Sequence, residues 1–207
     1  MKRVLLVVCL GMFMAVGQAI ASEPIQLSLT PDIAIHDKTT RITGLSLSIW
    51  GENPQSSLAL GIVNGFSGTS KGLSLGFFNY SDNYMGAQLG LVNYTEGSLL
   101  GGQLAFANYV EGSVKGLQWG LFNYAGNLTG GQLAWGNWVQ GSVIGLQVGF
   151  GNYAEQLTGL QLGFVNYADS VQAGVQIGIL NIIPQNQWFS GFPDELAKGM
   201  ILVNWRF

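Results

Sequence analysis

The side chains in this sequence that could do chemistry are amides, aromatic residues and carboxylates that recur at a nearly fixed spacing. A Tyr or Trp follows most copies of a repeated Asn, and a Gln precedes seven of them by five residues. The repeated Asn returns at an interval of about 15 residues, at Asn64, Asn79, Asn93, Asn108, Asn123, Asn137, Asn152, Asn166 and Asn181. Amides and aromatic rings suit saccharides, so one interpretation is a sugar-binding ladder. We expect the other interpretation, in which Tyr and Trp mark membrane interfaces and Asn ends each strand before its turn.

Catalytic and cofactor chemistry finds little support in the sequence. The chain has one His, His36, beside Asp37, and one Cys, Cys9. A hydrolase triad needs a nucleophile, a His and an acid brought together, and nothing marks the nucleophile. The sequence has neither a His and Cys cluster with metal-site spacing nor a glycine-rich phosphate loop between strand and helix. We therefore predict no enzyme, no cofactor and no resident metal.

The composition indicates an exported β protein. Of the 207 residues, 31 are Gly and only 9% are charged, against roughly 25% in an ordinary soluble domain. Residues 1–21 resemble a signal peptide, with Lys2 and Arg3 before an apolar segment and Ala19-Ile20-Ala21 as the cleavage pattern. Its removal would leave one domain, residues 22–207, with no cysteine and a net charge of −5. Nucleic acid is excluded as a partner because no basic cluster could neutralise phosphates.

The repeated phrase Gly-Leu-Gln-Leu-Gly-Phe-x-Asn-Tyr alternates large apolar residues with Gln and Gly, which is the period-2 pattern of a strand. Residues 101–129 and 130–158 match at 19 of 29 positions, which favours a duplicated pair of strands, a hairpin. The same rhythm predicts twelve strands, at about 25–36, 40–51, 56–65, 71–80, 85–94, 100–109, 115–124, 129–138, 144–153, 158–167, 173–182 and 198–207.

Strands of this length and even number favour an up-and-down antiparallel β-barrel in an outer membrane. The Leu face would then meet lipid, and the other face would line a lumen. Alternation places the repeated Asn on the lipid side and the Tyr that follows it on the lumen side. The lumen-lining candidates are Gln88, Gln103, Gln118, Gln132, Gln147, Gln161 and Gln176. Such a barrel could hold a narrow polar pore for small solutes or have a plugged interior.

The C-terminal strand carries a second signal. Ile201, Val203, Trp205 and Phe207 alternate up to a terminal aromatic residue. This pattern resembles the β-signal that ends outer-membrane barrel proteins and is read by their barrel-assembly machinery. The connector at about 183–197 is the only long one, so it would lie on the outside of the cell and could contact a surface partner or fold into the mouth.

The alternative architecture is a β-solenoid, in which each repeat is one coil and the Asn residues stack as a ladder. Five acidic residues argue against it, because each stands three residues after a repeated Asn and stacking would place several of them about 4.8 Å apart. These residues are Asp82, Glu96, Glu111, Glu155 and Asp169. We therefore expect the barrel.

Residues 57–182 also resemble uncharacterised bacterial surface-repeat proteins built from Gly-Leu-Gln-Leu-Gly-x-x-Asn-Tyr phrases. The resemblance implies an exported envelope protein and carries no known site. The function we expect is a minor passive pore or a structural component of the outer membrane. The alternative is a surface-exposed β-solenoid that binds glycan, calcium or a protein partner.

Overall fold

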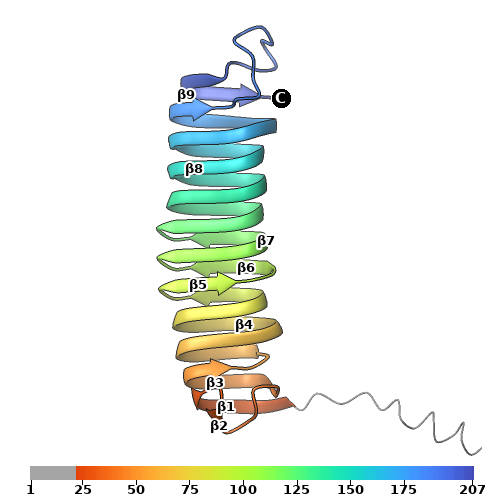
Figure 1. Cartoon of the computed structure of the whole chain (residues 1–207), viewed down its shortest axis with the longest axis vertical. Coiled ribbons are helices and arrows are strands. Elements are labelled where there is room, and N and C mark those ends of the chain that lie inside the picture. Colours follow the sequence, from red (N-terminus) through yellow and green to blue (C-terminus); the bar gives the residue numbers. More distant parts are fainter. Residues whose placement is uncertain (1–21) are drawn as a thin grey trace, which may run out of the picture.

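A computed structural model describes residues 22–207, so the predicted signal peptide lies outside the described residues. The strands are β1 (Ser22–Thr30), β2 (Ile33–Ala34), β3 (Arg41–Glu52), β4 (Ser56–Leu89), β5 (Val92–Thr95), β6 (Leu99–Leu104), β7 (Ala107–Trp119), β8 (Phe122–Ile182) and β9 (Gly199–Arg206). β4 and β8 are 34 and 61 residues long because each continues around several coils (Figure 1).

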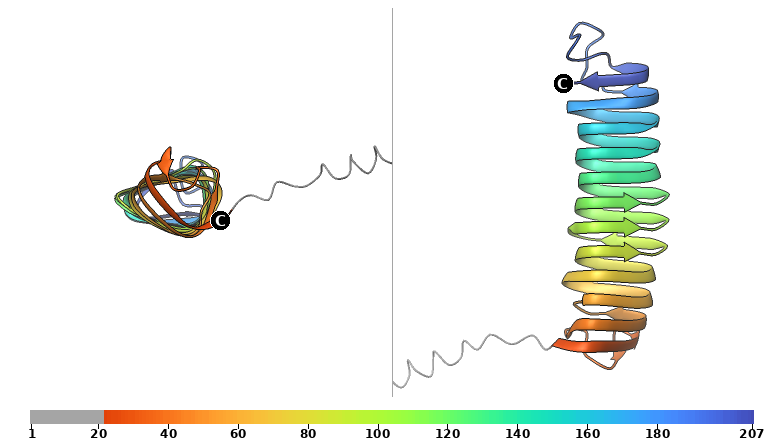
Figure 2. Two further views of the ribbon diagram at one scale, coloured as in Figure 1. Left: turned by 90° about the horizontal axis from the view of Figure 1, so that it is seen from below. Right: turned by 180° about the vertical axis from the view of Figure 1, so that it is seen from behind.

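The chain forms a β-solenoid, which corrects the predicted barrel. The coils stack in parallel along one axis, and Figure 2 shows the narrow cross-section from one end. The register advances by one repeat per coil, as in the pairs Asn93↔Asn108 and Asn108↔Asn123. The twelve antiparallel strands and the transmembrane barrel are therefore wrong, and so are the passive pore and the porin-like lumen that depended on them.

The duplicated segment, residues 101–129 with its copy 130–158, is a pair of coils and not a hairpin. The step from Asn108 to Asn123 is one residue longer than the step from Asn123 to Asn137, so two coils give the longer period without any reversal of chain direction. Within residues 22–207 the antiparallel pairs are β1 with β2 and β8 with β9, one at each end of the stack. Capping of this kind protects the open edges of a solenoid from pairing with other chains.

The predicted long connector, 183–197, follows β8 and returns to cover the outer edge of β9. The Leu196 amide donates to the Trp205 carbonyl at 3.3 Å, and the Phe207 amide donates to the Asp194 carbonyl at 2.9 Å. Glu195 forms an ion pair with Arg206 in the same place. The connector is therefore part of the cap that closes the C-terminal end.

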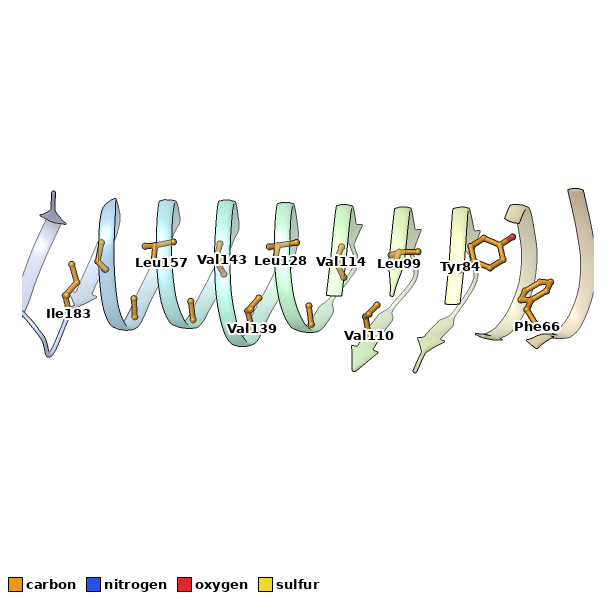
Figure 3. Close-up of a cluster of buried hydrophobic side chains, with 14 of the residues drawn as sticks. Phe66, Tyr84, Leu99, Val110, Val114, Leu128, Val139, Val143, Leu157 and Ile183 are labelled. Atoms are coloured by element: carbon orange, nitrogen blue, oxygen red, sulfur yellow. The ribbon is translucent and has the colours of Figure 1, made fainter. Parts of the chain in front are cut away.

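An apolar column fills one side of the interior. Its members come from successive coils and form two rows in Figure 3, one with Val114, Leu128 and Val143 and the other with Val110 and Val139. Most are Ala, Val or Leu, which pack closely inside the narrow coil, while the larger Phe66 and Tyr84 fill the coils near the N-terminal end. The other side of the interior is polar and is built from the repeated amides.

Candidate functional site

The repeated Asn residues form a continuous buried ladder. Each Asn side-chain amide donates to the side-chain carbonyl of the Asn one coil further on, at 2.8–3.0 Å from Asn64 to Asn181. The second N–H of the amide donates to the backbone, as from Asn123 to the Leu133 carbonyl at 3.1 Å. All nine side chains are at most 3% exposed, so the ladder holds coils together and offers no sugar-binding surface.

The seven Gln residues that we predicted to line a lumen form a second buried ladder. Each donates to the Gln one coil earlier at 2.7–3.0 Å, from Gln176 back to Gln88. The direction of donation is opposite to that of the Asn ladder, so the two rows of amide dipoles oppose each other. The Gln side chains are packed in the interior of the solenoid, at most 3% exposed, and do not face an aqueous lumen.

The aromatic residues that follow seven of the nine repeated Asn residues point outward and form what we call the tyrosine row: Tyr80, Tyr94, Tyr109, Tyr124, Trp138, Tyr153 and Tyr167. The rings stack along the solenoid axis in two runs, Tyr94 to Tyr124 and Trp138 to Tyr167. The centroids are 4.4 Å apart for Tyr109 and Tyr124 and 4.1 Å apart for Trp138 and Tyr153. Stacked rings present their edges and hydroxyl groups to a ligand, while their faces are covered by one another.

Carboxylates border the hydroxyl ends of this row. The Tyr94 hydroxyl donates to Glu111 at 2.7 Å, and the Tyr153 hydroxyl donates to Asp169 at 2.7 Å. These bonds satisfy acidic groups that we expected to repel one another in a solenoid. Gly126 and Gln140 also interrupt the acidic series between Glu111 and Glu155, so the expected repulsion is confined to short runs of coils and does not prevent stacking.

The carboxylates change the acidity of the tyrosines. The hydrogen bond to Glu111 raises the pKa of Tyr94 to about 12, and the bond to Asp169 raises the pKa of Tyr153 to about 12. In each case an anion already accepts the phenolic proton, so a second negative charge beside it is unfavourable.

Replacement of Glu111 by Gln should therefore lower the pKa of Tyr94 toward 10. An ultraviolet titration of tyrosinate, taken as the difference between variant and wild type, measures this shift. Since the folded pKa lies above the unfolded value, the contribution of this pair to stability is present below about pH 10 and is lost as the pH rises toward 12. If the difference titration shows no additional tyrosinate, equivalent to one Tyr, below pH 12 in the variant, the hydrogen bond from Tyr94 to Glu111 is contradicted.

A groove runs beside the tyrosine row, and we call it the aromatic groove. Its volume is about 550 Å³, and its lining includes no charged side chain. Ala107, Gly136 and Gly151 are the small residues of its lining, while Phe122 and the tyrosine row provide its large side chains. The groove spans five coils from Ala107 to Tyr167, or roughly 19 Å at the usual strand spacing.

Sequence reasoning missed this groove because it placed the Tyr side chains in a lumen. The signal was present in the residue before each repeated Asn, which is large in most coils. In three of four successive coils it is Ala107, Gly136 or Gly151, with Phe122 between the first two. Small residues at a position that is large in the other coils indicate a hollow on the surface only when that position is known to point outward.

The four residues of the predicted assembly signal lie at the C-terminal cap. Ile201, Val203 and Trp205 belong to β9, and Phe207 follows it with 68% of its surface exposed. β9 pairs with the last coil in antiparallel register, Val203 with Ile177 and Trp205 with Val175. Their predicted role in assembly depended on a barrel, whereas here they close the solenoid.

No family model, curated protein or solved structure matches this chain. The resemblance to bacterial surface-repeat proteins stays a prediction. Within residues 22–207 no three His, Cys, Asp or Glu side chains gather closely enough to hold a metal ion. The same part of the chain contains no helix with the length and hydropathy needed to cross a bilayer.

Proposed function

We propose that this protein is an exported, non-enzymatic binding solenoid whose aromatic groove holds an extended segment of a protein partner. The observation that carries the proposal is the groove itself, which is a long apolar hollow on a rigid stack of coils. Ligand sites are usually preformed concave surfaces with apolar linings and a few polar groups at the margin. The β-solenoid favours this function over a passive pore.

The dimensions of the groove fit an extended peptide. At about 3.3 Å per residue, roughly six residues would occupy its length of about 19 Å. Alternate side chains of an extended peptide point the same way, so apolar ones can enter the hollow above Gly136 and Gly151 while the others reach its margin.

The carboxylates at the margin of the aromatic groove favour positive charge on the peptide side chains that reach it. Glu111 and Asp169 accept bonds from the tyrosine row, and Glu155 lies exposed between them. Lys or Arg side chains on the peptide would meet these carboxylates, which gives specificity and steers association. The partner segment is therefore expected to alternate apolar and basic residues.

A fluorescein-labelled hexapeptide of alternating Leu and Lys tests this function. The Gly151→Leu variant should fill the groove without disturbing the fold, because a Cβ there would meet nothing within 4 Å. We expect peptide affinity, measured by fluorescence anisotropy, to fall about tenfold or more, which corresponds to about 1.4 kcal/mol. Gly199→Leu is the matched control, because its Cβ position is also open and lies outside the groove.

Two results would overturn the proposal. One is equal peptide binding by wild type and Gly151→Leu, which would place the peptide elsewhere on the surface. The other is that the hexapeptide of alternating Leu and Glu binds as tightly, because the acidic margin would then play no part. Binding of a neutral β-glucan hexasaccharide in the groove, with no peptide binding, would replace the protein partner by a glycan.

A further inference from the structure

A second outward face of the solenoid is entirely apolar. We call it the apolar face: it comprises the positions two, four and six residues before each repeated Asn, together with the corresponding residues of β1 and β3. In the coil of Asn123 these positions are Leu117, Trp119 and Leu121, with exposed fractions of 59%, 63% and 39%. Over the nine repeats they contain only Leu, Ile, Val, Phe, Trp, Ala and Gly. No hydrogen-bonding side chain other than the two indoles occurs at these positions of the nine repeats.

The apolar face is too large for an ordinary exposed patch. The register carries it from Leu27 in β1 through Leu47 in β3 to Leu60 in β4, and then along every later repeat. Eleven stacked strands at about 4.8 Å give a length of roughly 50 Å, and three alternate residues give a width of roughly 16 Å. The resulting area, roughly 800 Å², exceeds the roughly 300–600 Å² typical of a monomer and equals one side of a standard protein interface.

A second copy of this chain is the partner that matches the face in length, flatness and lack of charge. Sheets pack face to face about 10 Å apart through interdigitating side chains. A two-fold interface requires a surface that is complementary to itself. Each contact between a residue of one copy and a residue of the other then occurs twice, once on each side of the axis. The residue sizes six residues before each Asn, and the placement of the two Trp residues, meet this requirement.

The positions six residues before each Asn show the match. In successive coils they are Ala87, Gly102, Leu117, Gly131, Leu146 and Leu160. A two-fold axis midway between the coils of Leu117 and Gly131, with the two solenoids antiparallel, places large residues opposite small ones on both sides of the axis. Leu146 faces Gly102 of the second copy and Leu160 faces Ala87. At the axis itself, Leu117 lies over Gly131 of its own chain, where a Cβ would be 2.9 Å from the Leu117 Cδ2 atom.

The two Trp residues obey the same symmetry. The axis sets Trp119 opposite Leu133 of the second copy and Trp135 opposite Leu121, so no indole meets another indole. Gly102 leaves real space on the face, because the nearest atom to a Cβ there would be the Leu117 carbonyl oxygen at 3.8 Å. A Leu side chain from the second copy can occupy that space.

We propose that this protein forms an antiparallel homodimer through the apolar face, with the two-fold axis between the coils of Leu117 and Gly131. The inference does not depend on the proposed function, because the aromatic groove lies on another side of each coil. The dimer removes the apolar face from water and leaves both grooves open.

Sedimentation velocity over a range of concentrations tests the dimer, and a swap of sizes tests its register. Gly102→Leu should raise the dimer dissociation constant about tenfold or more, because it fills the space that Leu146 of the second copy needs. Adding Leu146→Ala to Gly102→Leu should restore most of the affinity. Trp119→Glu should give monomers, whereas Ile144→Glu, a charge on an exposed residue outside the face, should leave the dimer intact. Circular dichroism checks that each variant keeps its fold.

Several results would overturn this proposal. The proposal is overturned if the wild-type protein stays monomeric at all concentrations, or if the dimer persists in Trp119→Glu. Failure of Leu146→Ala to rescue Gly102→Leu would reject the antiparallel register. Flotation of monomers with phospholipid vesicles, abolished by Trp119→Glu, would assign the face to a lipid surface instead.

Discussion

Replacement of Asn123 by Leu is expected to reduce the free energy of unfolding by about 4 kcal/mol or more, a large part of the stability of a typical domain. Asn123 accepts a bond from Asn108 at 2.9 Å and donates to Asn137, the Gln118 carbonyl and the Leu133 carbonyl at 3.0–3.1 Å. A Leu of similar size leaves a side-chain N–H of Asn108 and the side-chain carbonyl of Asn137 without their ladder partner, whereas the Leu133 carbonyl keeps the Gly120 amide at 3.0 Å. Each orphaned buried group costs about 1–3 kcal/mol. Urea unfolding followed by circular dichroism measures the loss.

The matched control is Asn127→Leu. Asn127 is exposed and accepts one bond, from the Ser142 amide at 3.0 Å. Water can replace that bond, so we expect this variant to lose less than about 1 kcal/mol. Equal losses in the two variants would show that the Asn ladder does not hold the coils together.

The second large effect is expected from Gly130→Ala. Gly130 has a φ of 131°, and a Cβ there would overlap the Gly116 carbonyl oxygen of the adjacent coil. The obstacle is backbone and cannot turn aside, so the coils would have to separate at this corner. We expect a loss of about 3 kcal/mol or more, from the left-handed conformation and the clash together.

Gly151→Ala is the control for this substitution, since a Cβ at Gly151 meets nothing within 4 Å. Thermal unfolding should show a clear drop of the transition temperature for Gly130→Ala and little change for Gly151→Ala. Similar transition temperatures would mean that the coils do not approach each other at Gly130 as described. The same left-handed Gly recurs in successive coils, at Gly72, Gly86, Gly101, Gly116, Gly130, Gly145 and Gly159.

The sequence predicted the period of the strands. It also predicted which side chains point inward and which point outward in the first strand of each coil, but not after the corner that follows. Alternation correctly separated the inward Gln from the outward Leu in the first strand of each coil. It failed at the corner that follows, where Leu121 and Phe122 both point outward with exposed fractions of 39% and 65%. Two successive outward residues reverse the alternation, so Asn123 turns inward and Tyr124 outward, opposite to the prediction.

The choice between barrel and solenoid could not be made from alternation, because both architectures place one face of each strand inside. The solenoid is decided by contacts between coils: the amide ladders, the Gly corners and the bonds from Tyr94 and Tyr153 to carboxylates. The terminal aromatic residue favoured the barrel, yet a strand that closes a solenoid also alternates. The aromatic groove was hidden by the same reversal at the corner.

Spin labels at Lys115→Cys and Thr129→Cys test the solenoid most directly, with Cys9 changed to Ser so that the labels are the only two. These residues are register partners in adjacent parallel strands, so their backbones should lie about 5 Å apart. In the antiparallel barrel they would stand at opposite ends of neighbouring strands, roughly 30 Å apart. Strong dipolar broadening in the frozen electron paramagnetic resonance spectrum is the result that the solenoid predicts. A spectrum without broadening, with the long label separation expected of the barrel, would contradict it.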